Sequence, residues 1–294
     1  MTLHDMDTTP IDLTAFDMAD RYVVFGNPIK HSRSPQIHAA FAAQTQQHLT
    51  YRAQLIELGH FATTAREFFD GGGKGCNITV PFKLDAFAFA NELSGRARRA
   101  GAVNTLAVQG DGSIYGDNTD GTGIVRDIDQ NLAWEINDRR VLIIGAGGAV
   151  RGVLEPLLKR HPKFLLVVNR TVEKAQQLAR EFSDLGDVRA CSFEALAGNQ
   201  FDLIINATST GLRGESLPLP SNLLAEGCCC YDMSYGAQPT PFMRWAACEA
   251  AWAVADGLGM LVEQAAEAFC IWRGVRPQTR PVIDMLRASL SAGG

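Results

Sequence analysis

Short apolar runs alternate with amphipathic stretches in the second half of the chain. VLIIG (141–145), FLLVVNR (164–170), FDLIINAT (201–208) and CCCYDMSY (228–235) have the length and composition of buried strands. Helical patterns follow the first two runs; in residues 172–182, apolar or alanine residues recur at one- and three-residue steps. Repeated strand–helix units of this length predict a parallel, doubly wound sheet.

The first half also alternates, although less regularly, and predicts a second α/β unit. A helix begins with Ser34 as the N-cap and Pro35 as its first residue. Further helices are expected at 60–70 and 82–92, and strands at 21–26, 51–56, 76–80, 102–108 and 113–116.

A last helical stripe follows the second unit, so we expect it to return and pack on the first unit. Its apolar members are Leu258, Leu261, Val262, Ala265, Ala268, Phe269 and Trp272.

Charge and composition argue against nucleic acid and membranes as partners of this protein. The 294 residues carry a net charge of −5, and the aspartates at positions 5, 7, 12, 17 and 20 account for all of it. Without a basic stripe, a nucleic-acid partner is not expected. No apolar run approaches the ~18–20 residues of a membrane span, and the start MTLHDMD has no signal-peptide pattern. We expect a cytoplasmic protein without a membrane partner, preceded by a mobile acidic extension at 1–19.

The seven cysteines do not have the spacing of a zinc site. We therefore expect no metal, and reduced, mostly structural thiols. Cys228, Cys229 and Cys230 fall within an apolar segment, where thiols behave as small buried hydrophobic side chains.

A glycine-rich loop joins the strand at 141–145 to the next helix. In VLIIGAGGAVRG, Gly145, Gly147 and Gly148 permit a tight turn and a close approach of backbone N–H groups to a pyrophosphate. Val150 stands where the common pattern has glycine or a small residue. The flanking strand and helix, and a second strand about 20 residues on, favour a Rossmann-type dinucleotide site over a glycine-rich turn of another purpose.

Residues after the second strand of this unit indicate which dinucleotide binds. A site for NAD is expected to have Asp or Glu there, whereas this chain has Asn169, Arg170 and Thr171, with Lys174 one turn on. Arg170 can stack on adenine or pair with a 2′-phosphate. The sequence therefore favours NADP over NAD, unless Arg170 and Lys174 are ordinary surface cations.

Polar side chains also gather in the first unit. Ser32 and Ser34 stand beside a helix start, which suits a substrate carboxylate, although Ser34 could simply cap the helix. In CNITV, alternation places Asn77 and Thr79 on one face of a strand, opposite Ile78 and Val80, where they could bind substrate hydroxyls.

A charged pair is possible across the cleft between the two units. Lys83 lies in the first turn of a helix, and Asp120 belongs to the polar segment DNTDGTG at the junction of the units. Asn104, in AVNTL, adds an amide near a strand. The alternatives are a solvated lysine at position 83 and an Asx turn or helix cap at position 120.

Taken together, FGNPIKHSRSP, NITVPFK, GAVNT, GDNTDG, IGAGGAVRG, NRT, INATS, YDMSY and ADGLGMLVEQAA resemble the shikimate dehydrogenase family. The match runs in order from residue 22 to about 286. NITVPFK combined with DNTDG is specific to this family, whereas the glycine loop alone is not.

The resemblance implies reversible NADPH-dependent reduction of 3-dehydroshikimate to shikimate, on the route to chorismate and aromatic amino acids. Lys83 matches the family's catalytic lysine and Asp120 its aspartate partner. The implied substrate-binding residues are Ser32, Ser34, Asn77, Thr79, Asn104, Thr119, Tyr235 and Gln264. The implied cofactor residues are Gly145, Ala146, Gly147, Gly148, Ala149, Asn169, Arg170, Thr171 and Lys174, with Met233 and Gly257 near the nicotinamide.

The implied organisation is a substrate-binding domain at 20–118, completed by 258–294, and a Rossmann-type NADP-binding domain at 119–257. We expect a monomer or a homodimer, although the sequence does not decide between them. The nearest alternative is a quinate/shikimate dehydrogenase that uses NAD, against which Asn169, Arg170 and Thr171 argue. The other alternative is a nucleotide-binding regulator that has lost its catalytic activity. Such a protein should have lost Lys83 or Asp120, and this chain has both.

Overall fold

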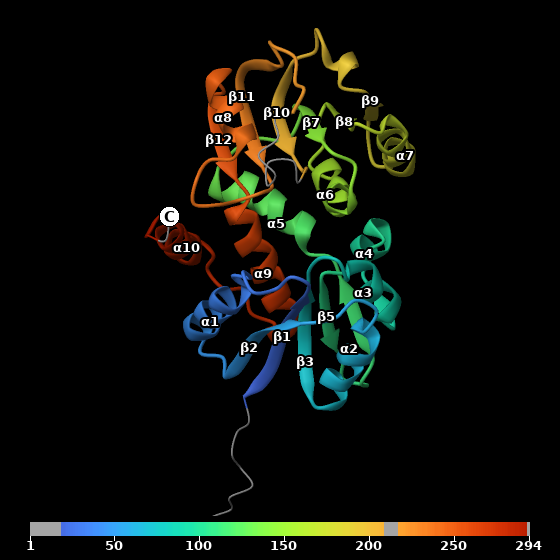
Figure 1. Cartoon of the computed structure of the whole chain (residues 1–294), viewed down its shortest axis with the longest axis vertical. Coiled ribbons are helices and arrows are strands. Elements are labelled where there is room, and N and C mark those ends of the chain that lie inside the picture. The colour runs from blue at the N-terminus through green and yellow to red at the C-terminus, as the bar shows by residue number, and fades with distance from the viewer. Residues whose placement is uncertain (1–18, 209–216, 293–294) are drawn as a thin grey trace, which may run out of the picture.

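Two six-stranded sheets, joined by two helices, make up the protein (Figure 1). The computed structural model describes residues 19–208 and 217–292. The acidic extension expected at 1–19 lies, except for its last residue, outside the described residues.

The lower sheet in Figure 1 is mixed, in the order β2-β1-β3-β5-β6-β4. β1 is parallel to both of its neighbours, whereas β5 is antiparallel to β3 and β6. Its strands are β1 (Asp20–Gly26), β2 (Leu49–Leu55), β3 (Gly73–Ile78), β4 (Glu92–Leu93), β5 (Thr105–Val108) and β6 (Ile114–Asp117). Its helices are α1 (Ser34–Thr45), α2 (Phe61–Asp70), α3 (Lys83–Phe89) and α4 (Gly95–Ala100).

The upper sheet is parallel throughout, in the order β12-β11-β10-β7-β8-β9. This order confirms the doubly wound, Rossmann-type sheet. Its strands are β7 (Arg140–Ile144), β8 (Phe164–Val168), β9 (Val188–Cys191), β10 (Phe201–Asn206), β11 (Leu224–Asp232) and β12 (Ala253–Asp256). Its helices are α6 (Gly148–Leu158), α7 (Val172–Phe182) and α8 (Pro241–Cys248), with a 3-10 turn at Glu194–Leu196.

Helices α5 (Asp120–Arg126) and α9 (Leu258–Arg273) lie between the two sheets (Figure 1). They approach closely, since a Cβ on Gly123 would lie 2.8 Å from Gln264 Cβ. On the other side, α9 packs Val262 and Phe269 against Ile37 and Phe41 of α1. The expected return of this helix to the first unit is therefore confirmed. A π-helix (Asp127–Asn131) extends α5, and α10 (Arg280–Ala292) ends the described chain.

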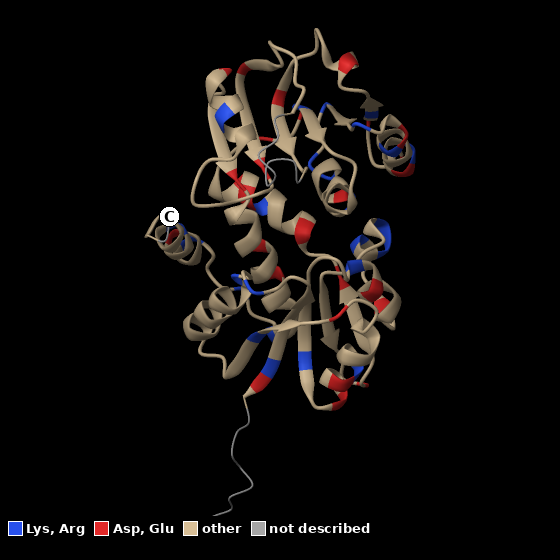
Figure 2. Ribbon diagram, in the orientation of Figure 1, with Lys and Arg blue, Asp and Glu red and all other residues tan. Residues whose placement is uncertain are grey.

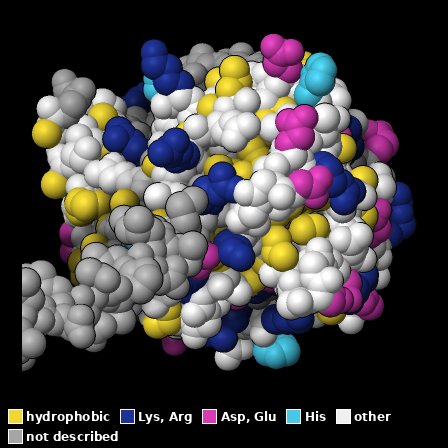
Figure 3. All heavy atoms as spheres, turned by 90° about the horizontal axis from the view of Figure 1, so that it is seen from below, with side chains coloured by type: hydrophobic (Ala, Val, Ile, Leu, Met, Phe, Trp, Pro, Cys, Tyr) yellow, Lys and Arg dark blue, Asp and Glu magenta, His cyan; other side chains and the backbone are white. Residues whose placement is uncertain are grey.

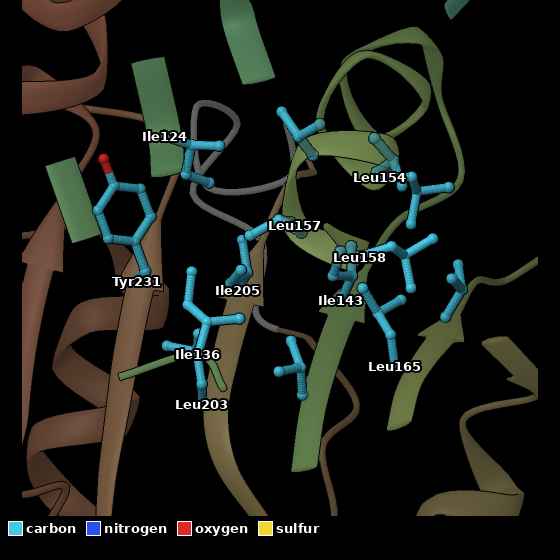
Figure 4. Packing of buried hydrophobic residues seen from close by; sticks show 14 of the residues in the cluster. Ile124, Ile136, Ile143, Leu154, Leu157, Leu158, Leu165, Leu203, Ile205 and Tyr231 are labelled. Carbon is cyan, nitrogen blue, oxygen red and sulfur yellow. The ribbon is translucent and has the colours of Figure 1, made fainter. Parts of the chain in front are cut away.

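The apolar core of the upper unit lies between α5, α6 and the sheet (Figure 4). Ile124, Leu157 and Ile205 are fully buried there, and Tyr231 donates a hydrogen bond of 2.7 Å to the buried Asp127 carboxylate. Val150 is also fully buried in this cluster. Its isopropyl group is thus accommodated at the start of α6, where glycine or a small residue is more usual.

A second contact joins the units on the side of α4, a short arginine-rich helix (Figure 2). Arg99 lies 4.8 Å from the ring centre of Phe182 in α7 and donates a 2.7 Å hydrogen bond to the Glu181 carbonyl. The face seen from below mixes both signs of charge with hydrophobic side chains (Figure 3). Among the described residues, no helix is long and apolar enough to cross a membrane.

Two local predictions were wrong. Arg33, and not Ser34, is the N-cap of α1, and no side chain caps this helix. The strand expected at 76–80 starts at Gly73 and ends at Ile78, so Val80 is 62% exposed and no longer follows the alternation of the strand. Backbone hydrogen bonds to the β1 segment nevertheless continue beyond the strand, from the Thr79 N–H to the Phe25 carbonyl at 2.9 Å and from the Asn27 N–H to the Val80 carbonyl at 3.1 Å. Pro81 has no N–H to donate, so the pairing cannot extend past Val80.

Candidate active site

A cavity of about 540 Å³ opens between the lower sheet and α9. It is lined by the loop after β1, the end of β3, the start of α3 and α5, the loop after β11, and α9. Most residues assigned to substrate or nicotinamide line it: Ser32, Ser34, Asn77, Thr79, Lys83, Asn104, Asp120, Met233, Tyr235, Gly257 and Gln264.

Lys83 and Asp120 form an ion pair within this cavity. Lys83 begins α3, Asp120 begins α5, and their Nζ and Oδ2 atoms are 2.5 Å apart. The other oxygen of Asp120 accepts a hydrogen bond of 2.7 Å from the amide of Asn104. Lys83 is thus not a freely solvated helix lysine, and Asp120 does more than cap a helix. The pair places an ammonium donor and a carboxylate side by side on the cavity wall.

Asn77 is held by hydrogen bonds at both ends of its amide group. Its amide nitrogen donates to the Asn104 carbonyl (3.2 Å) and to Thr105 Oγ1 (3.1 Å). Its oxygen accepts a bond of 2.7 Å from the hydroxyl of Tyr51. With both amide hydrogens engaged, Asn77 can offer a ligand an acceptor. Tyr51 was not expected at the site, because it lies on β2 and no local motif marks it.

Thr119 does not line the cavity, unlike the other residues assigned to the substrate. It is fully buried, and its backbone N–H donates to the Asn104 side chain at 2.9 Å. Its hydroxyl lies 3.4 Å from Gln264 Oε1. Thr119 therefore connects Asn104, next to Asp120, with Gln264 on α9.

Ser32 and Ser34 lie at the start of α1 on the same cavity wall. The backbone N–H of Ser34 donates to Ser32 Oγ at 3.3 Å. Pro35 has no N–H, so the donors that the start of α1 contributes to the cavity wall are chiefly these two hydroxyls. Such a set of donors suits an anionic oxygen.

His38 is a buried histidine behind this wall. It is 1% exposed, and its ring stacks on Tyr51 with centroids 4.1 Å apart. Neither ring nitrogen has a hydrogen-bond partner among the described residues. Burial lowers the pKa of His38 to about 3, and contact with Asn77 opposes this only in part. The imidazole is therefore neutral at ordinary pH.

We predict that His38 makes the protein less stable in mild acid. The unfolded chain takes up a proton near the ordinary pKa of 6.5, whereas the folded chain does so only near 3. Stability that is present above pH 6.5 is therefore lost as the pH falls below it. Between about pH 7 and pH 5, the wild type should lose on the order of 1–2 kcal/mol more unfolding free energy than His38→Phe.

Urea unfolding of both proteins at the two pH values measures this difference, since the other titrating groups are common to both. Parallel losses of stability in the two proteins would show that His38 is not the responsible group.

The glycine loop joins β7 to the start of α6 and has the geometry of a pyrophosphate site. Gly145 has φ of +117°, a conformation that favours glycine. Gly147 is the N-cap of α6, and no side chain caps the helix start. Cβ atoms placed on Gly147 and Gly148 would meet open space. The first N–H groups of α6 are therefore accessible to an anion, so the loop fits a dinucleotide.

The adenine-side residues follow β8. Arg170, Thr171 and Lys174 are exposed, and Asn169 donates a hydrogen bond of 2.9 Å to the Thr171 carbonyl. Among the described residues, neither Arg170 nor Lys174 makes a recorded side-chain hydrogen bond or ion pair, so both charges are available. The glycine loop and these residues do not line the 540 Å³ cavity.

Met233 and Gly257 lie where the upper sheet meets the cavity. A Cβ on Gly257 would lie 2.2 Å from the Met233 carbonyl oxygen, closer than real Cβ contacts. Only glycine fits at this position without a backbone shift. On the side of the cavity that faces the upper sheet, the backbones at Met233 and Gly257 therefore lie in close contact.

Models of three related domains match the chain in order. The shikimate dehydrogenase substrate-binding domain matches residues 24–106, the shikimate/quinate 5-dehydrogenase domain residues 127–212, and the shikimate 5′-dehydrogenase C-terminal domain residues 257–287. An NADP(+) shikimate dehydrogenase from Methylococcus capsulatus is 58% identical, over 92% of this chain and 96% of that protein. This chain belongs to the shikimate dehydrogenase family.

Other relatives agree with this placement. A shikimate dehydrogenase (NADP(+)) from Cellvibrio japonicus is 57% identical over 93% of this chain and 99% of its own. Two solved structures share the fold. An Ael1 enzyme from Pseudomonas putida has a TM-score of 0.86 and 46% identity, covering 91% of this chain and 98% of its own. A family member from Thermus thermophilus, solved with NADP(H) and shikimate, has a TM-score of 0.82 and 32% identity, covering 92% and 100%.

Proposed function

We infer that this protein catalyses the reversible, NADPH-dependent reduction of 3-dehydroshikimate to shikimate, in the biosynthesis of chorismate and aromatic amino acids. The observation that carries this inference is the Lys83–Asp120 pair in a cavity of substrate size, within a chain that matches the family along nearly its whole length. The activity makes the protein an NADP-dependent oxidoreductase that acts on a CH–OH group.

Lys83 and Asp120 are the residues that we assign to the chemistry. When NADPH is bound, its nicotinamide supplies the hydride for the carbonyl carbon. The Lys83 ammonium donates a hydrogen bond, and then a proton, to the carbonyl oxygen on which charge develops. Asp120 holds Lys83 in position through their 2.5 Å contact and orients a substrate hydroxyl.

The remaining polar side chains of the cavity bind the substrate in this proposal. Ser32, Ser34 and Tyr235 receive the carboxylate at the end of the cavity next to α1. Asn77 accepts a hydrogen bond from a ring hydroxyl through its amide oxygen, and Thr79, Asn104 and Gln264 bind the other hydroxyls. We assign Thr119 to positioning Asn104, since it is fully buried.

The cofactor assignments follow the loop geometry. The N–H groups at Gly145 to Ala149 receive the pyrophosphate, and Asn169, Arg170, Thr171 and Lys174 receive the adenine ribose and its 2′-phosphate. Met233 and Gly257 border the nicotinamide. We place the boundaries of the cofactor domain at residues 119 and 257, close to where β6 ends and α9 begins.

We further propose that the enzyme is a cytoplasmic monomer or homodimer. All seven cysteines are free thiols, as is typical of a reducing compartment.

The identity of the substrate is tested by initial rates with NADP⁺ and either shikimate or quinate. Quinate is included because residues 127–212 match a domain shared by shikimate and quinate 5-dehydrogenases. We expect shikimate to be oxidised with a kcat/KM at least about tenfold above that of quinate. Equal or higher kcat/KM for quinate would contradict the assignment.

The cofactor preference is tested by Arg170→Asp. This variant places a carboxylate against the 2′-phosphate, and we expect the ratio of kcat/KM with NADP⁺ to that with NAD⁺ to fall at least about tenfold. Arg180→Asp, at the far end of α7, makes the same charge change away from the site and should leave the ratio unchanged. If both variants keep the wild-type ratio, Arg170 does not discriminate between the cofactors.

A further inference from the structure

The charged side chains of the cavity are not balanced. Lys83 is neutralised by Asp120 at 2.5 Å. Arg33 also lines the cavity and is half-buried, yet its side chain makes no recorded hydrogen bond or ion pair with any residue that the structure describes. No other carboxylate lines this cavity among the described residues. Within the part of the chain that the structure describes, a positive charge therefore remains uncompensated beside the space that the substrate would fill.

The position of Arg33 places this charge at one end of the cavity. Arg33 is the N-cap of α1, between Ser32 and Ser34, and its carbonyl accepts the Ile37 N–H at 3.1 Å. Tyr235 also lines the cavity, and it packs against the apolar cluster that contains Ile37 and Phe41 of α1. Burial raises the pKa of the Tyr235 hydroxyl, and the charge of Arg33 acts against this rise, as expected for a guanidinium close to the phenol.

Hydroxyl and backbone donors alone discriminate weakly between a carboxylate and its neutral ester, because both present acceptor oxygens of similar geometry. A guanidinium adds an attraction that exists only for the anion, and it is stronger in a partly buried site than at the open surface. Lys83 cannot supply this attraction, since it is already paired with Asp120 at the reacting end.

We propose that Arg33 is a specificity-determining residue, whose unpaired guanidinium in the cavity wall selects the carboxylate form of the substrate over neutral analogues. This inference rests on the proposed function, and the feature of the substrate that Arg33 recognises is its ionised carboxyl group. Ser32, Ser34 and Tyr235 hold the carboxylate in position, and Arg33 favours its ionised form over a neutral group. Neither Lys83 nor Asp120 takes part in this discrimination.

The test compares shikimate with its methyl ester in the wild type, Arg33→Gln, Arg33→Lys and the control Lys30→Gln. Lys30 is a cation three residues away that is exposed and does not line the cavity. For shikimate, KM and kcat are measured with NADP⁺; for the ester, the inhibition constant against shikimate is measured. All assays are run in the same buffer at one fixed pH. Melting temperatures report on folding.

We expect Arg33→Gln to raise the KM for shikimate about tenfold, with kcat changed less than about threefold, and to leave the inhibition constant of the ester within about twofold. Arg33→Lys should recover most of the affinity for shikimate. Lys30→Gln should change both constants less than about twofold, because an exposed charge is screened.

Two results would overturn the role of Arg33: an equal loss for shikimate and its ester, or an unchanged KM for shikimate in Arg33→Gln. The wild-type arm separates this failure from a failure of the proposed function. If the wild type does not oxidise shikimate with NADP⁺, the proposed function is wrong and the inference falls with it. If the wild type is active and the variants do not discriminate, only the inference about Arg33 is wrong.

Discussion

Replacing Lys83 with alanine is expected to lower kcat by at least about 100-fold, as positioned acid–base groups typically contribute ~10²–10⁴-fold to rate. The ammonium is the proton donor for the substrate oxygen, and no other lysine lines the cavity among the described residues. The dissociation constant of NADP should hardly change, because Lys83 begins α3 in the lower unit, away from the glycine loop. Affinity for shikimate should fall much less than kcat, since Ser32 and Ser34 remain.

Steady-state kinetics give kcat, and fluorescence titration gives the NADP dissociation constant. The comparison is valid if the melting temperature of the variant equals that of the wild type. A kcat within threefold of the wild type, or roughly 0.65 kcal/mol on the barrier, would remove Lys83 from the mechanism. Asp120 would then be the candidate acid–base group.

Replacing Asp120 with asparagine is expected to lower kcat by about 100-fold as well. The substitution keeps the shape of the side chain but removes the negative charge that holds the Lys83 ammonium at 2.5 Å. Asparagine has one acceptor oxygen and one NH2 group, so it cannot accept from both the Lys83 ammonium and the Asn104 amide, which now donate to the two oxygens of Asp120. Whichever of the two donors faces the NH2 group loses its acceptor and is displaced from the geometry that the reaction needs.

Asp85→Asn is the matched control, because Asp85 is an exposed acid in the first turn of the same helix as Lys83. Its kcat should stay within about twofold of the wild type, as is usual for a surface substitution. The double variant Lys83→Ala/Asp120→Asn should be little slower than either single variant, because residues that act as a unit are not additive. Strictly additive losses would show that the two residues act independently.

The regular parts of the fold were predictable from the sequence because their signals are local. The apolar runs before residues 145 and 170 lie in β7 and β8, and the glycine loop follows β7 as expected. The stripe from Leu258 to Trp272 indicated α9 and its return to the first unit, since a surface of that width must be buried. Such patterns specify an element without reference to the rest of the chain.

Elements with weak local signals were missed. β9 and β12 have four residues each, β4 has two, and α4 has six with three arginines. None of them is long enough to show the periodic pattern of apolar residues that identifies a strand or a helix. These elements are stabilised by pairing with strands or helices that lie elsewhere in the chain. α10, which follows α9, was not expected either.

The site was predicted unevenly for the same reason. The pairing of Lys83 and Asp120 could be suggested from a resemblance and from their places at the ends of elements. Tyr51 and His38 could not, because their relation to Asn77 depends on the packing of β2 and α1 against β1 and β3. Arg33 is adjacent to two predicted residues, but only the structure shows that it lines the cavity and that its side chain has no partner among the described residues.

The most direct test follows the hydride itself. Shikimate carrying deuterium on the carbon that bears the reacting hydroxyl is incubated with NADP⁺ and the purified full chain, and the reduced cofactor is analysed by mass spectrometry. The account predicts deuterated NADPH in an amount equal to the 3-dehydroshikimate formed, with little product when NAD⁺ replaces NADP⁺. Reduced cofactor without deuterium, or the absence of any shikimate-dependent reduction, would contradict it.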